Sequence, residues 1–82
     1  MVNNKYPCPC CGYYTLTSKG HYDLCEVCYW EDDPLQSENH KYEGGANEMC
    51  LNKAKENYEK FGAVSDEFVR LVRQPRKNET IP

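Results

Sequence analysis

The apolar positions divide the chain into two halves with different spacing. Between residues 47 and 73 they recur at helical intervals, and most other positions are polar or charged. One face of an α-helix would carry Cys50, Leu51, Ala54, Tyr58 and Phe61. Asn47 is suited to cap this helix, and Gly62 is suited to end it in the left-handed conformation. We therefore predict a first helix between these two residues.

A second and shorter apolar stripe follows in the same half. Ser65 precedes two acidic residues, which favour the first turn of a helix. The apolar members of the stripe are Phe68, Val69 and Val72. The segment should end before Pro75, because a residue that precedes proline avoids the helical region. Residues 47–73 thus predict a helical hairpin, and residues 76–82 a tail.

The first half, residues 6–34, has strand-like segments and contains five of the six cysteines. Residues 13–17 and 21–25 are rich in aromatic and β-branched side chains. Residues 18–20 separate them and end in a glycine, as in a three-residue hairpin loop. We predict a β-hairpin here, joined to the helices by a polar loop over residues 35–46.

The cysteines of this half have the spacing of a metal site. Cys8, Cys11, Cys25 and Cys28 form two C-x₂-C pairs separated by thirteen residues. Two residues between thiolates allow a tight turn that directs both sulfurs at one ion, and Gly12 can adopt the positive φ that leaves the turn. Four protein ligands leave no open position, so the site should hold one structural Zn²⁺, each sulfur roughly 2.3 Å from it. Iron is the alternative occupant, because it accepts the same ligands.

Chain length and composition strengthen this interpretation. At 82 residues and a mean hydropathy of −0.91, apolar burial alone would stabilise the fold only marginally. Residues 1–5 lead into no apolar signal segment, and there is no membrane-length apolar run, so we expect a cytoplasmic protein. In that reducing compartment metal binding is favoured over the alternatives, disulfides or buried free thiols. We predict a single α+β domain over residues 1–82, a zinc-bearing hairpin with two helices packed on it.

The remaining thiols and the histidines are expected to lie outside the metal site. Cys10 should not be a ligand, although a shift of one residue would exchange it for a neighbouring cysteine, and it could instead be a redox-active thiol. Cys50 belongs to the apolar helical stripe and should be a core residue. His21 and His40 should be ordinary surface residues.

An acidic and aromatic segment follows the second cysteine pair and has two interpretations. It consists of Trp30, Glu31, Asp32 and Asp33. In the first interpretation, the tryptophan packs in the core and the acids are solvated. In the second, these residues form a recognition surface for a basic protein.

Several segments together resemble the bacterial cysteine-rich CPCC family. They are Cys8-Pro9-Cys10-Cys11-Gly12, Cys25-Glu26-Val27-Cys28-Tyr29-Trp30 and Gly44-Gly45-Ala46-Asn47. The likeness continues to Val72-Arg73-Gln74-Pro75 and Glu79, and so covers nearly the whole chain. It implies a small metal-binding protein without a defined activity.

Charge and residue chemistry favour a binding role over the alternatives. The formal net charge is −3, and four bound thiolates with one divalent cation bring it to about −5. We expect a protein-interaction module, such as an inhibitor or immunity protein for a basic partner, that is neither an enzyme nor bound to membranes. A nucleic-acid-binding ribbon is one alternative, through Lys53, Lys55, Lys60, Arg70, Arg73, Arg76 and Lys77. A metalloenzyme or a thiol enzyme that uses Cys10 is another, but no base is paired with that nucleophile.

Overall fold

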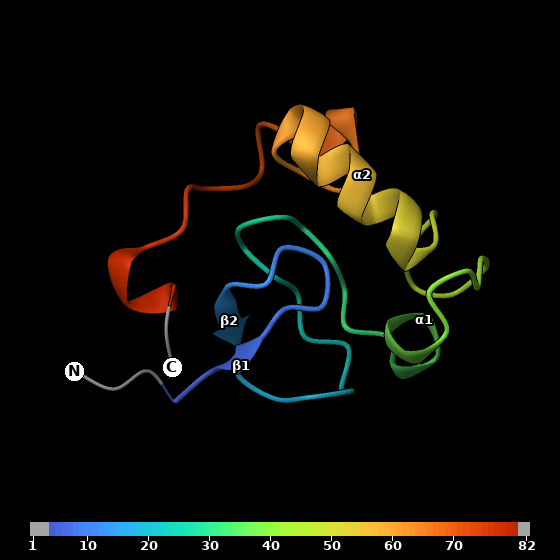
Figure 1. Cartoon of the computed structure of the whole chain (residues 1–82), viewed down its shortest axis with the longest axis horizontal. Coiled ribbons are helices and arrows are strands. Elements are labelled where there is room, and N and C mark those ends of the chain that lie inside the picture. The colour runs from blue at the N-terminus through green and yellow to red at the C-terminus, as the bar shows by residue number, and fades with distance from the viewer. Residues whose placement is uncertain (1–3, 81–82) are drawn as a thin grey trace.

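The computed structural model describes residues 4–80, which form a short antiparallel hairpin followed by two α-helices (Figure 1). The strands are β1 (Tyr6–Pro7) and β2 (Tyr14–Leu16), and the helices are α1 (Pro34–Glu38) and α2 (Leu51–Phe61). Two 3₁₀ turns follow, η1 (Asp66–Phe68) and η2 (Lys77–Glu79). The predicted α+β class is therefore confirmed, although several elements lie elsewhere than predicted. Among these residues, no helix has the length and apolar character needed to cross a bilayer.

The hairpin encloses the first cysteine pair instead of joining the two pairs. Tyr6 lies opposite Leu16, and Pro7 lies opposite Tyr14, with an irregularity between Tyr6 and Pro7. The prediction that residues 13–17 pair with residues 21–25 was wrong in its choice of partner. A C-x₂-C turn already reverses the chain, so the segments that flank it are the nearest partners for each other.

The second cysteine pair is enclosed in the same way. The Tyr22 amide donates to the Asp32 carbonyl at 3.1 Å, and the Cys25 amide donates to the Trp30 carbonyl at 2.9 Å. Leu24 and Glu31 form an isolated antiparallel bridge between these segments. Residues 21–25 therefore pair with the chain that follows their own turn, and each cysteine pair has its own hairpin-like turn.

Helix α1 lies at the start of the segment that was predicted to be a polar loop. Asp33 caps it, because its carboxylate accepts a hydrogen bond from the Leu35 amide at 2.9 Å. Pro34 occupies the first helical position, where its missing N–H costs nothing. The Asp-Pro sequence was thus a helix start signal within the acidic segment.

Helix α2 ends where predicted but starts later. Gly62 adopts φ 84° and its amide donates to the Tyr58 carbonyl, as expected of the C-terminal glycine. The N-cap is Cys50 instead of Asn47, whose side chain is engaged elsewhere. On the predicted stripe Leu51 and Ala54 are buried, whereas Phe61 is 45% exposed.

The predicted second arm of a helical hairpin is only the 3₁₀ turn η1 and a following turn. The chain leaves this turn after Leu71, and the Arg73 amide donates to the Glu26 carbonyl at 3.1 Å. Val69 is 42% exposed, and Phe68 and Val72 are only half-buried, so the short stripe has too little buried surface to hold a longer helix. The tail then returns to the body, where η2 lies against β2 (Figure 1).

The core lies between the two cysteine turns and α2. Its largest fully buried side chains include Trp30, Leu16, Leu51, Val27 and Val64, and four buried cysteines share the same cluster. The core is therefore continuous with the candidate metal centre, so the packing of α2 also positions the sulfur atoms.

Candidate metal centre

The two cysteine pairs adopt one backbone conformation. In the first, the Gly12 amide donates to the Cys8 carbonyl at 2.8 Å, and Gly12 has φ 82°. In the second, the Tyr29 amide donates to the Cys25 carbonyl at 2.8 Å, and Tyr29 has φ 75°. The positive φ predicted for Gly12 is confirmed, and Tyr29 adopts the same left-handed conformation despite its side chain. Two like turns thus present two sulfurs each.

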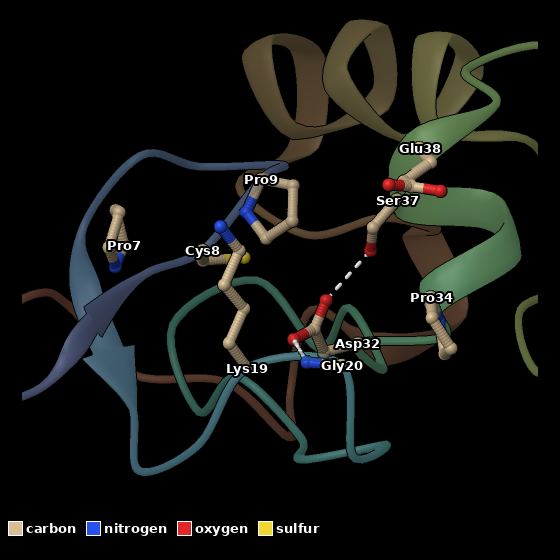
Figure 2. Close-up of a pocket in the computed structure, with 9 residues that line it drawn as sticks. All are labelled: Pro7, Cys8, Pro9, Lys19, Gly20, Asp32, Pro34, Ser37 and Glu38. Atoms are coloured by element: carbon tan, nitrogen blue, oxygen red, sulfur yellow. Dashed lines mark hydrogen bonds between the residues drawn. The ribbon is translucent and has the colours of Figure 1, made fainter.

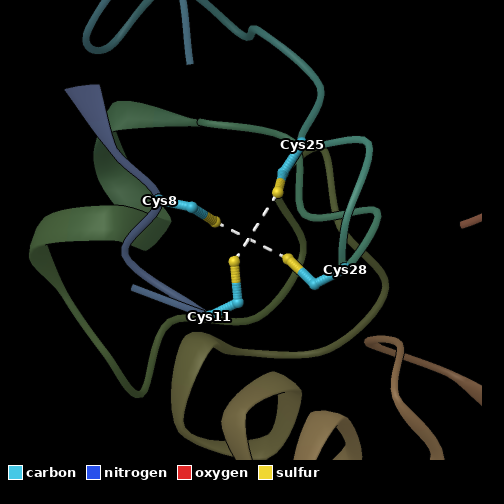
Figure 3. A group of neighbouring side chains, drawn as sticks. All are labelled: Cys8, Cys11, Cys25 and Cys28. Carbon is cyan, nitrogen blue, oxygen red and sulfur yellow. Dashed lines mark hydrogen bonds between the residues drawn. The ribbon is translucent and has the colours of Figure 1, made fainter. Parts of the chain in front are cut away.

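The four sulfur atoms converge on one point (Figure 3). All lie within 4.8 Å of one another; Cys8 and Cys28 are separated by 3.6 Å, and Cys11 and Cys25 by 3.7 Å. A regular tetrahedron with metal–sulfur distances of about 2.3 Å has edges of about 3.8 Å. These separations are too long for disulfides, whose sulfurs lie about 2 Å apart, and all six cysteines are free. The four cysteines therefore fit a tetrahedral metal ion.

The four thiols lie close enough to shift one another's pKa values in opposite directions. The hydrogen bond with Cys11 raises the pKa of Cys8 far above its ordinary value, and the bond with Cys25 does the same to the pKa of Cys11. Hydrogen bonds from the other three thiols lower the pKa of Cys25, and the Thr15 hydroxyl adds a bond of 2.9 Å to its sulfur. Four thiolates at such distances need a cation to compensate their charge. This donor set suits zinc or iron.

Cys10 lies beside this group but outside it. It is 8% exposed, and its hydrogen bonding to Cys28 is the largest influence raising the pKa of that thiol. The predicted ligands Cys8, Cys11, Cys25 and Cys28 are thus brought together without it. Cys50 is half-buried at the start of α2, and both histidines are exposed and outside the group.

A model of the family described as "Cysteine-rich CPCC" matches residues 6–79. The chain belongs to this family. No curated protein matches its sequence significantly. The match covers both cysteine pairs, α1 and α2, and ends within the tail of this CPCC protein.

The acidic segment of the CPCC protein is mostly buried, which corrects the predicted partner surface. Trp30, Asp32 and Asp33 are 0%, 2% and 5% exposed, and only Glu31 is partly accessible. The Asp32 carboxylate accepts from the Gly20 amide at 2.6 Å and from the Ser37 hydroxyl at 2.7 Å. The prediction that these residues form a recognition surface was wrong for these three. The competing interpretation was right about the tryptophan and wrong about solvated acids.

Asp33 belongs to a buried polar network that fixes the loop before α2. The fully buried Gln36 donates to the carbonyls of Asn47 and Met49 at 3.1 Å, and its side-chain oxygen accepts from the Asn47 amide at 2.9 Å. Asp33 accepts from the Ala46 amide at 2.9 Å. A Cβ on Gly45 would collide with Asp33 and approach Gln36 to 2.7 Å. No pattern in the sequence predicted this network or the role of Gln36.

A cavity of about 480 Å³ lies beside Cys8 (Figure 2). Three prolines form much of its wall, Pro7, Pro9 and Pro34. Its buried carboxylate, Asp32, accepts hydrogen bonds from Gly20 and Ser37. These bonds give Asp32 a structural role.

Proposed function

We propose that this chain is a non-catalytic protein whose four-cysteine group holds one structural Zn²⁺, and that the resulting scaffold acts as a protein-binding module. The observation that carries the metal proposal is the pair of crossed sulfur separations, 3.6 and 3.7 Å, each joining one cysteine turn to the other. Zinc is preferred to iron because it is the usual occupant of closed structural four-thiolate sites.

The ion would hold together two cysteine turns that are not joined by a β-sheet ladder. The only sheet pairs β1 with β2, so no ladder among residues 4–80 joins the two cysteine turns. A structural zinc supplies on the order of 10 kcal/mol to the folded state of a small domain. We therefore expect metal binding and folding of this chain to be one equilibrium.

The first prediction concerns the ligand Cys25 and the matched thiol Cys50. Cys25→Ser should lose the metal and unfold, since it removes the fully buried sulfur that is bonded by Thr15. Native mass spectrometry should find one zinc per wild-type chain and one per Cys50→Ser chain. Circular dichroism should show the fold lost in Cys25→Ser alone.

These measurements distinguish zinc from iron and test whether the metal stabilises the fold. A coloured protein with iron in the mass spectrum would show that the site holds iron and not zinc. A wild-type chain that stays folded after complete chelation would refute the structural role of the metal.

A protein partner is favoured over nucleic acid on electrostatic grounds. The net charge is −3, and part of the basic surface is neutralised within the chain. Arg73 binds both Glu26 and Glu79, and Lys53 lies 3.6 Å from Glu56. Binding to phosphates would have to overcome this neutralisation. A mobility shift of mixed DNA and RNA by the zinc-loaded chain at low salt would contradict the proposal.

A further inference from the structure

A second cavity, of about 230 Å³, forms a groove between the second cysteine turn and the segments around α2. Its apolar side chains include Leu24, Tyr29, Met49 and Phe68, and its acidic ones are Glu31 and Glu48. We call it the Tyr29–Phe68 groove. We propose that it binds an apolar side chain of a partner protein that carries a lysine or arginine next to that side chain. This inference rests on the proposed protein-binding role.

The apolar part of the groove is preorganised. The Tyr29 and Phe68 rings stack with centroids 4.4 Å apart and planes 27° apart. Tyr29 holds its ring there from a left-handed backbone at φ 75°, a conformation that a residue with a side chain seldom adopts. The Val64 amide, at the groove, donates to the Cys28 carbonyl at 2.8 Å. The groove is therefore tied to the cysteine turn and need not order on binding.

Met49 and Leu24 make the groove accessible and adaptable. Met49 is half-buried, and its flexible thioether can adjust to an inserted side chain. Leu24 is 38% exposed at the edge. An apolar anchor would cover both side chains, which the isolated chain leaves partly in water.

The negative charge of the groove favours a basic residue next to the apolar side chain that the partner would insert. The carboxylates of Glu31 and Glu48 line the groove, and no lysine or arginine lies among the lining residues. Within residues 4–80, neither Glu31 nor Glu48 forms a salt bridge, whereas Glu26, Glu56 and Glu79 do. Two unneutralised carboxylates beside an apolar groove favour a cation at its edge. Glu31 is thus the one member of the predicted acidic surface that remains available.

The test uses a phage library of random dodecapeptides selected on immobilised zinc-loaded protein. We expect enriched peptides to carry a leucine or an aromatic residue within two positions of a lysine or arginine. A synthetic copy of the best peptide should bind Glu31→Lys/Glu48→Lys about tenfold more weakly or worse, because two attractive charges become repulsive. Isothermal calorimetry measures this change.

The matched control carries the same change of net charge outside the groove. Glu43 and Glu59 are exposed and do not line it, so Glu43→Lys/Glu59→Lys should retain the wild-type affinity. A third variant, Phe68→Ala, should weaken binding, whereas Phe61→Ala, at an exposed ring on α2, should not. Zinc content and circular dichroism establish that each variant is folded.

Several results would overturn the inference. They are enrichment without a basic and apolar pair, equal binding by the two double variants, and self-association through the groove detected by sedimentation. If the protein carries one zinc and these results are found, the groove proposal fails and the metal proposal stands. If the metal is absent, the metal proposal fails whatever the peptides do.

Discussion

The ion pair between Glu79 and Arg73 should contribute measurably to stability, although both residues lie far along the chain from the cysteine turns. The Glu79 carboxylate is 5% exposed and accepts two hydrogen bonds from the Arg73 guanidinium, at 2.8 and 2.7 Å. It also accepts from the Arg76 amide at 2.7 Å. Arg73 in turn binds Glu26, within the second cysteine turn, at 3.0 Å. Glu79 thereby joins the tail to the metal centre.

The magnitude follows from the carboxyl pKa. The hydrogen bond from Arg73 lowers the pKa of Glu79 from 4.5 to about 2. Such a shift corresponds to about 3 kcal/mol of preference for the ionised folded form. A glutamine retains one acceptor, so Glu79→Gln should lower the free energy of unfolding by about 2 kcal/mol.

The pH dependence has a definite sign. Since the folded pKa lies below the unfolded one, this contribution is complete above pH 4.5 and is lost as the pH falls toward 2. The difference in the free energy of unfolding between wild type and Glu79→Gln should therefore be the same at pH 7 and at pH 5.5.

Urea denaturation of both proteins with excess zinc measures the difference. Glu67→Gln is the matched control, because Glu67 is exposed and forms no salt bridge within residues 4–80. A loss for Glu79→Gln below about 0.5 kcal/mol, or an equal loss in the control, would refute the reasoning.

Two further predictions concern the neighbours of the metal centre and of the buried network. Gly45→Ala should destabilise the fold by about 1–3 kcal/mol in urea denaturation, because the methyl group collides with Asp33 and Gln36; an unchanged midpoint would contradict the packing. Thr15→Val should weaken zinc binding about tenfold in competition with a chelator, since it removes the hydroxyl that donates to Cys25, and unaltered affinity would contradict that role.

The ligand group could be predicted from the sequence because its geometry is local. Two residues between cysteines fix the conformation of each turn, and Gly12 marked the left-handed exit of the first. The equivalent position in the second turn is Tyr29, whose conformation no sequence rule indicates, because side chains oppose it. The structural role of Tyr29 is apparent only from the packing of its ring on Phe68.

The errors concern which segments and side chains pair with each other. Residues 21–25 have the composition of a strand, but composition does not select a partner, and the nearest one was the chain after the second turn. The acids of the Trp30 segment were expected in solvent because carboxylates are seldom buried. Here the amides of Gly20 and Ala46, far along the sequence, satisfy Asp32 and Asp33. Such long-range pairing is not encoded in local spacing.

The separate closure of each cysteine turn has a consequence for the order of assembly. Each turn joins residues only a few positions apart, so each can form early and at a small cost in chain entropy. During synthesis, residues 6–16 would emerge first and could bind the ion with two sulfurs before the second turn exists. Capture by Cys25 and Cys28 would then complete the coordination, and the later helices would seal a centre that is already loaded.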